Sequence, residues 1–187
     1  MAIAVSQSSI PGVLLIKPSI HRDERGWFSE SFKASEFAKA GISEPFVQDN
    51  LSWSARRGTL RGLHFQRPPF AQAKLVRCLR GSIVDVVVDL RRGSPTEGTW
   101  SAFELDADAG DMVWVPRGLA HGYQTLVDDC LITYKTTAEY SPEHELGIRW
   151  DDRTLAIVWP IAHAAVSPRD AALPLAADVP SVFEWPS

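Results

Sequence analysis

Two short stretches of the chain place polar side chains at spacings that suit a single site. In "GTLRGLHFQRPPFAQAKLVRCLRG", which starts at residue 58, His64, Gln66 and Lys74 lie between flanking glycines. In "GDMVWVPRGLAH", which starts at residue 110, His121 follows two glycines and a proline. A histidine on a strand is more often a polar core residue than a reactive one. The two matched spacings together favour function, either as a metal site or as a site of proton transfer.

The same spacings resemble the two motifs of the cupin superfamily, in which a small β-barrel points its ligands at a metal ion. The second motif matches at Gly110, Pro116, Gly118 and His121. In the first motif, Gln66 replaces a histidine and Lys74 replaces the acidic ligand. A charged lysine has no lone pair to give and repels a cation, so the sequence predicts no bound metal.

A lysine in the place of a metal can still stabilise negative charge on a substrate oxygen, such as that of an enolate. Its charge also favours a neutral His64, and a neutral imidazole can accept a proton from carbon. We therefore expect His64 to act as a base and Lys74 as its oxyanion partner.

Short runs of alternating apolar residues must position these side chains. Examples are "LVRCLRG", "SIVDVVVDL", "DMVWVPRG", "HGYQTLVDD" and "CLITYKTTAEY", which are separated by Gly, Pro and Asp turn signals. This spacing predicts a mainly β protein built as an antiparallel sandwich or barrel. Two short helices are expected, one over "ASEFAKAG" with Ser35 as N-cap and Gly41 at its end, and one capped by Ser167 in "SPRDAAL".

Composition limits the classes of function. A length of 187 residues with 45% hydrophobic residues predicts one globular domain over 1–187, with a helical or extended tail from about residue 165. The net charge of −4 argues against nucleic-acid and membrane partners, and the absence of a long apolar run or signal peptide predicts a cytoplasmic protein. We expect Cys78 and Cys130 to be reduced core residues.

Residues 56–92 carry nine cations against two carboxylates. This local excess of positive charge is either a solvated strand face or a site for a small anion such as a phosphate.

Longer motifs resemble one family within the superfamily. They are "RDERGWFSESF", "FVQDNLSWS", the long stretch from "LRGLHFQ" to "PTEGTW", "VPRGLAHGYQTL" and "YKTTAEYSPEHELGIRWDD". From about Gly12 to the "SPRDAALPL" segment, the chain is similar to the dTDP-4-dehydrorhamnose 3,5-epimerases. The resemblance implies a cupin-like antiparallel jelly-roll barrel that needs no metal or cofactor and works as a homodimer. It also implies inversion of C3 and C5 of dTDP-4-keto-6-deoxyglucose, both of which flank the C4 ketone.

The resemblance adds two catalytic residues, Tyr134 as the acid and Asp170 as the partner of the base. Without it, Tyr134 reads equally well as an ordinary strand aromatic, and Asp170 as the acidic residue of a capping box three positions after Ser167. For substrate binding, the resemblance implies a set in which Tyr140 stacks on the thymine: Arg25, Glu30, Gln48, Asn50, Arg61, His121, Tyr140, Glu145 and Arg169.

The family pattern is not matched everywhere. Glu139 stands where many members have a second aromatic residue, and Trp27 and Trp53 are larger than expected beside the site. Two alternatives remain open: a C3-only or C5-only epimerase of a related dTDP-4-ketosugar, and a non-catalytic cupin that binds sugar nucleotides. A binding module would need no opposed acid and base, so the set His64, Lys74, Tyr134 and Asp170 favours an enzyme.

Overall fold

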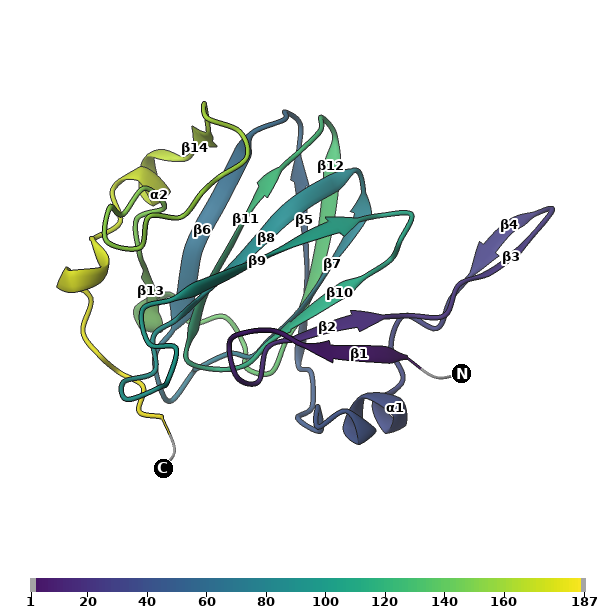
Figure 1. The fold of residues 1–187 in the computed structure, drawn as a ribbon, viewed down its shortest axis with the longest axis horizontal. Coiled ribbons are helices and arrows are strands. Elements are labelled where there is room, and N and C mark those ends of the chain that lie inside the picture. The colour runs from purple at the N-terminus through teal and green to yellow at the C-terminus, as the bar shows by residue number, and fades with distance from the viewer. Residues whose placement is uncertain (1–2, 186–187) are drawn as a thin grey trace.

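The computed structural model describes residues 3–185, which form two facing β-sheets (Figure 1). The first sheet runs in the order β1 (Ala4–Gln7), β2 (Leu14–Lys17), β10 (Met112–Val115), β7 (Lys74–Arg80), β12 (Cys130–Thr136) and β5 (Gln48–Ser54). The second runs in the order β13 (Glu145–Gly147), β6 (Thr59–Gln66), β11 (Leu119–Thr125), β8 (Ser82–Asp89) and β9 (Trp100–Asp106). All these neighbours are antiparallel, which confirms the predicted mainly β architecture.

The core between the sheets is built from alternate residues of each strand, because successive side chains on a strand point to opposite faces. Val76 of β7 and Ile132 of β12 meet Ile83 and Val87 of β8 in one buried cluster. Cys78 and Cys130 belong to the same cluster as free, buried thiols, as predicted. Burial raises the pKa of the Cys78 thiol to about 12, so this thiol stays protonated.

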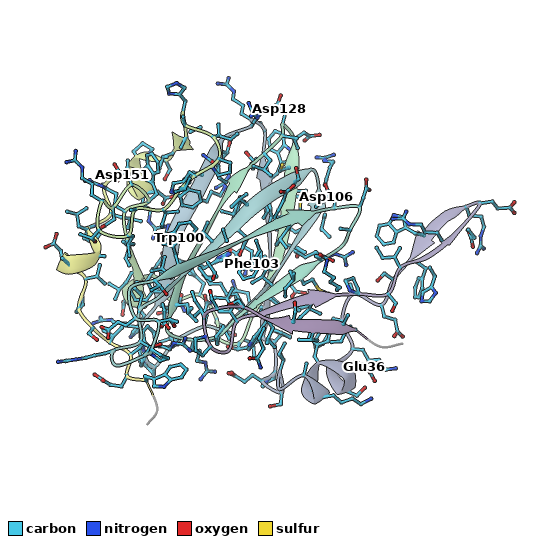
Figure 2. The ribbon with its side chains drawn as sticks, viewed as in Figure 1. Glu36, Trp100, Phe103, Asp106, Asp128 and Asp151 are labelled. Carbon is cyan, nitrogen blue, oxygen red and sulfur yellow. The ribbon has the colours of Figure 1, made fainter. Side chains whose placement is uncertain are left out.

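The outer face of the second sheet is covered by the chain that follows β13. Leu63, Val86 and Ala120 point outward and pack against tail residues that include Val179 and Phe183. In Figure 1 this tail runs beside β6 and β13, and it contains β14 (Ala165–Val166), α2 (Pro168–Ala171) and the 3-10 helix Ala176–Asp178. Figure 2 shows Trp100, Phe103 and Asp106 along β9, the strand at the far edge of this sheet.

Several contacts fasten the tail to the barrel. Asp152 accepts hydrogen bonds from the backbone N–H groups of Thr154 at 2.7 Å and Ala176 at 2.7 Å. Farther along, the N–H of Trp185 donates to the carbonyl of Arg92 at 2.9 Å, and the Arg91 guanidinium lies 4.3 Å from the centre of a Trp185 ring. The tail is therefore a fixed part of the fold.

A hairpin of β3 (His21–Asp23) and β4 (Gly26–Phe28) projects away from the barrel (Figure 1). Every residue of its two strands is exposed, and the side chains include two large apolar groups, Trp27 and Phe28. We call residues 21–28 the arm.

The first predicted helix is present as α1 (Ala34–Lys39), but its predicted N-cap is wrong. The cap is Lys33, whose carbonyl accepts from the N–H groups of Glu36 and Phe37, so Ser35 already lies inside the helix. The helix packs on the first sheet through the buried Phe37. Gly41 follows the helix with a φ of 87°, as expected for its end. The second helix confirms its prediction, because the Ser167 hydroxyl accepts the Asp170 N–H at 3.0 Å.

A short helical turn completes the framework near the site. The 3-10 turn Pro142–His144 leads directly into β13, whose residues pair with β6.

No helix within residues 3–185 is long and apolar enough to cross a bilayer.

Candidate active site

Strand alternation carries polar residues onto the inner faces of the sheets, beyond the end of the apolar core. On β7, Lys74 lies on the same face as the core residues Val76 and Cys78. On β12, Tyr134 is two residues from Ile132 and packs against the same cluster. The remaining inward polar positions are contributed by β6 and β11, where His64 and His121 stand opposite each other.

These side chains surround a cavity of about 380 Å³. Its lining holds all four predicted catalytic residues together with three of the predicted substrate-binding residues. The lining residues are Leu51, Ser52, Arg61, His64, Lys74, His121, Tyr123, Tyr134, Ser167, Arg169 and Asp170. We call this space the main cavity.

His64 is held by the tail. Its Nε2 lies 2.9 Å from Oδ1 of Asp170, whose other oxygen accepts the Gly62 N–H at 3.2 Å. Burial raises the pKa of Asp170, but the hydrogen bonds from His64, Gly62 and Ser167 bring it below its ordinary value. An ionised Asp170 assigns the proton to Nε2, which leaves the Nδ1 lone pair of His64 free to act as a base.

Gly62 makes this arrangement possible at the junction of β6 and β11. It has a φ of 124°, and a Cβ at this position would lie 2.6 Å from Cα of Gly122. Any side chain here would push the two strands apart, and with them His64 and His121.

Lys74 is a buried amine in the wall of the main cavity. Its side chain donates to the carbonyl oxygen of His64 at 3.3 Å. Burial lowers the pKa of Lys74 to about 8, and the charges of Asp85 and Glu145 oppose part of this effect. The amine is therefore mostly protonated at neutral pH and is poorly solvated, which favours strong interaction with an oxyanion.

A second histidine–carboxylate pair lies beside the first. Nε2 of His121 is 2.7 Å from Oδ2 of Asp85, and both side chains are buried. Among the described residues, Oδ1 of Asp85 has no hydrogen-bond partner. Asp85 was not predicted as a site residue, although an aspartate inside the apolar run "SIVDVVVDL" is the signal that marks it.

Two phenols also line the main cavity, Tyr134 from β12 and Tyr123 from β11. Burial raises the pKa of Tyr134, and the neighbouring Tyr123 and Glu145 raise it further, so its proton is retained at neutral pH. Tyr123, which the sequence did not indicate, makes a 2.8 Å hydrogen bond between its hydroxyl and that of Ser52.

Four of the other predicted binding residues connect in a network outside the main cavity. Gln48 donates to Asn50 at 2.8 Å and accepts the backbone N–H of Tyr140 at 2.8 Å. The Tyr140 hydroxyl donates to Glu145 at 2.5 Å, and Arg169 pairs with the same carboxylate oxygen. Because Arg169 also lines the main cavity, this network continues the site outward.

Gln66, the second polar position of the first motif, serves a structural role. Its amide nitrogen donates to the carbonyls of Phe70 at 2.7 Å and Glu139 at 3.1 Å, and its oxygen accepts the Ser141 N–H at 2.8 Å. It fixes the loop that carries Tyr140.

Arg25 and Glu30 do not reach the main cavity of their own chain. Arg25 lies in the arm and pairs with Asp23 at 2.5 Å, and Glu30 follows the arm. Trp27 is on the arm too, and the exposed Trp53 donates to Asp129 at 2.5 Å. Neither tryptophan lines the main cavity of its own chain.

The cations of residues 56–92 divide between two roles. Arg91 forms a buried pair with Asp89 at 2.8 Å, and Arg80 pairs with Asp129 at the surface. Arg61 and Lys74 face the main cavity. The excess of positive charge is thus partly structural and partly available to an anionic ligand.

The residues do not fit a divalent metal. Within residues 3–185 no group of three or more His, Cys, Asp or Glu side chains could hold one. Lys74 also places a cationic amine beside the two histidines.

Comparison with known proteins gives a consistent assignment. The family model for dTDP-4-dehydrorhamnose 3,5-epimerase matches residues 7–178. An enzyme of that name from Sinorhizobium fredii is 48% identical over 178 residues, which is 95% of this chain and 91% of the relative.

Two solved structures show the same fold. A dTDP-6-deoxy-D-glucose-3,5-epimerase from Legionella pneumophila, in complex with dTDP-4-keto-L-rhamnose, matches with a TM-score of 0.94 and 39% identity over 99% of this chain and 100% of that one. A 3'-monoepimerase from Streptomyces bikiniensis, in complex with dTDP-quinovose, matches with a TM-score of 0.85 and 37% identity. The match covers 91% of this chain and 86% of that one. The barrel is thus the predicted cupin-like jelly roll, and the chain belongs to the dTDP-4-dehydrorhamnose 3,5-epimerase family.

Proposed function

We propose that this chain inverts C3 and C5 of dTDP-4-keto-6-deoxyglucose to give dTDP-4-keto-L-rhamnose, with His64 as base, Tyr134 as acid and Lys74 as oxyanion partner. The observation that carries the proposal is that base and acid come from facing sheets. His64 lies on β6 of the second sheet and Tyr134 on β12 of the first, and both line the main cavity. A base and an acid on opposite walls are what inversion of a carbon requires.

In the proposed reaction each inversion uses the same three residues. Nδ1 of His64 takes the proton from the carbon next to the C4 ketone, and the C–H electrons move to the ketone oxygen as an enolate. Lys74 stabilises that oxygen. Tyr134 gives its proton to the other face of the carbon as the ketone reforms. C3 and C5 flank the same carbonyl, so one set of residues can serve both carbons.

The sugar nucleotide would extend along the network outside the cavity. The guanidinium groups of Arg61 and Arg169 suit the diphosphate, since their N–H groups match its oxygens in pairs. Tyr140 is 48% exposed and free to stack on the thymine, with Gln48, Asn50 and Glu145 beside it. His121, held by Asp85, would donate to or accept from a sugar hydroxyl.

We further propose that the chain works as a single domain, in the cytoplasm, and as a homodimer. Arg25 and Glu30 lie outside their own main cavity, and the arm exposes 48% of Trp27 and 63% of Phe28. A partner subunit that received the arm would bury this apolar surface and bring the arm's Arg25 to a nucleotide site.

Proton NMR of the substrate with enzyme in D₂O tests the proposed reaction. We expect deuterium at both C3 and C5, and a His64→Ala variant slower by about 10²–10⁴-fold in exchange at both carbons. Deuterium at one carbon after long incubation would assign a single epimerase, the class of the Streptomyces bikiniensis neighbour. Tight binding without any exchange would assign a binding module.

A further inference from the structure

A second chamber adjoins the main cavity on the side of the tail. It has a volume of about 210 Å³ and lies between β13 and tail residues 173–180. Of its lining residues, His64 and Arg169 also line the main cavity. His64 therefore forms part of the wall between two separate spaces, and 27% of its side chain is exposed to solvent.

The second chamber reaches His64 beside its strand partner, Gly147. Gly147 of β13 stands opposite His64 of β6, and opposite residues of antiparallel strands direct their side chains to the same face. A Cβ on Gly147 would lie 2.7 Å from the carbonyl oxygen of Leu63 and 2.8 Å from a methyl carbon of Leu173, so the glycine lets Leu173 pack directly against the strand. Leu173 thus borders the space beside the imidazole, while Glu145 and Asp178 give the chamber carboxylate groups that can hydrogen-bond to water.

The chemistry of two inversions requires such an approach. After the first inversion His64 holds the proton taken from carbon, and Tyr134 has lost its own. Before His64 can act as a base again, one proton must pass from it to water, and Tyr134 must gain one from water, so the protons balance. The bound sugar occupies the main cavity at this stage, and water must reach the imidazole from another side.

We propose that the second chamber is the port through which His64 exchanges its proton with solvent while the sugar fills the main cavity. The proposal rests on the proposed function, in which His64 is the base. It assigns the apolar side chain of Leu173 to the wall of that port.

The test compares proton exchange with inversion in D₂O. Leu173→Phe fills the port, so His64 keeps the abstracted protium longer and returns it to the same carbon. We expect the ratio of deuterium in recovered substrate to product formed, measured at low conversion, to fall severalfold. Singly inverted sugar should accumulate, because the second step waits for His64 to lose its proton.

Val182→Phe is the matched control, since Val182 lines a different, apolar chamber of about 170 Å³ beneath the same tail. It should keep the wild-type ratio. A wild-type ratio in Leu173→Phe overturns the port and leaves the epimerase function standing, whereas absence of exchange in the wild-type enzyme refutes the function itself. If Leu173→Phe fails to melt cooperatively, Val179→Phe fills the port from its other wall, and an unchanged ratio there overturns the proposal equally.

Discussion

Replacement of Lys74 by methionine should inactivate the protein. It should also remove the cost of burying a charged amine at neutral pH, a cost that the wild type loses in alkali. Lys74 is 8% exposed, and burial lowers its pKa from 10.5 to about 8. One pKa unit corresponds to about 1.4 kcal/mol, so holding the charged amine in the fold costs roughly 3 kcal/mol below pH 8.

The sign of the pH dependence follows from proton counting. Below pH 8 the amine is protonated in both the folded and the unfolded chain, and the full cost is present. Between about pH 8 and 10.5 the folded protein has released this proton while the unfolded chain still holds it. The contribution of Lys74 to the free energy of unfolding therefore becomes more favourable as pH rises through this window.

Urea denaturation of both proteins from pH 7 to 10.5 measures the effect. The free energy of unfolding of the wild type minus that of Lys74→Met should rise by roughly 3 kcal/mol across the range, because contributions from other titrating groups cancel. The kcat/KM of the wild type should fall above about pH 8, since this quantity reports the free enzyme and a neutral amine stabilises an enolate poorly. Parallel stability curves, or a kcat/KM that stays level through pH 9, would refute the assignment of a charged, buried Lys74.

Three further variants have defined outcomes. Asp170→Asn should slow exchange at C3 and C5 by about 10²–10⁴-fold while sparing nucleotide affinity, because an amide N–H facing Nε2 favours the tautomer with a protonated Nδ1; unchanged exchange would exclude the His64–Asp170 pair from catalysis. Tyr134→Phe should keep deuterium exchange but lose inversion, as followed by NMR, and equal loss of both would give Tyr134 a different role. Asp152→Ala should lower the free energy of unfolding by roughly 1–3 kcal/mol at pH 7. Hydrogen bonds outweigh burial and lower the pKa of Asp152 to about 2, so the wild-type advantage should be lost as pH falls from about 4 toward 2. The prediction fails if urea denaturation gives the same difference in free energy of unfolding between variant and wild type at pH 7 and at pH 2.5.

The parts of the fold that sequence could predict are those that depend on local pattern. The runs that became β7, β8, β10, β11 and β12 alternate apolar and polar residues or are apolar throughout, and each was recognised. β5 was not recognised, because its residues "QDNLSWS" are mostly polar. It lies at a sheet edge, where alternate side chains remain exposed and hydrophobic periodicity is weak.

The parts of the site that sequence could not predict depend on pairing between distant strands. Asp85 meets His121 because β8 and β11 pair in the register that sets Val87 opposite His121 and Asp85 opposite Tyr123. The side chains of His121 and Asp85 then lie on one face as diagonal neighbours. No short motif contains that register. The placement of Arg25 outside the main cavity likewise follows from the direction of the arm.

The dependence of His64 on the tail gives the enzyme an order of assembly. Asp170 is synthesised 106 residues after His64, and the contacts at Arg92 that hold the end of the tail involve Phe183 and Trp185. Until this segment has left the ribosome, Asp170 cannot pair with His64, and the imidazole is neither oriented nor fixed in one tautomer. In the proposed mechanism the oriented base is therefore completed last, and a chain that ends before Asp170 would lack both the partner of His64 and the apolar cover of the second sheet.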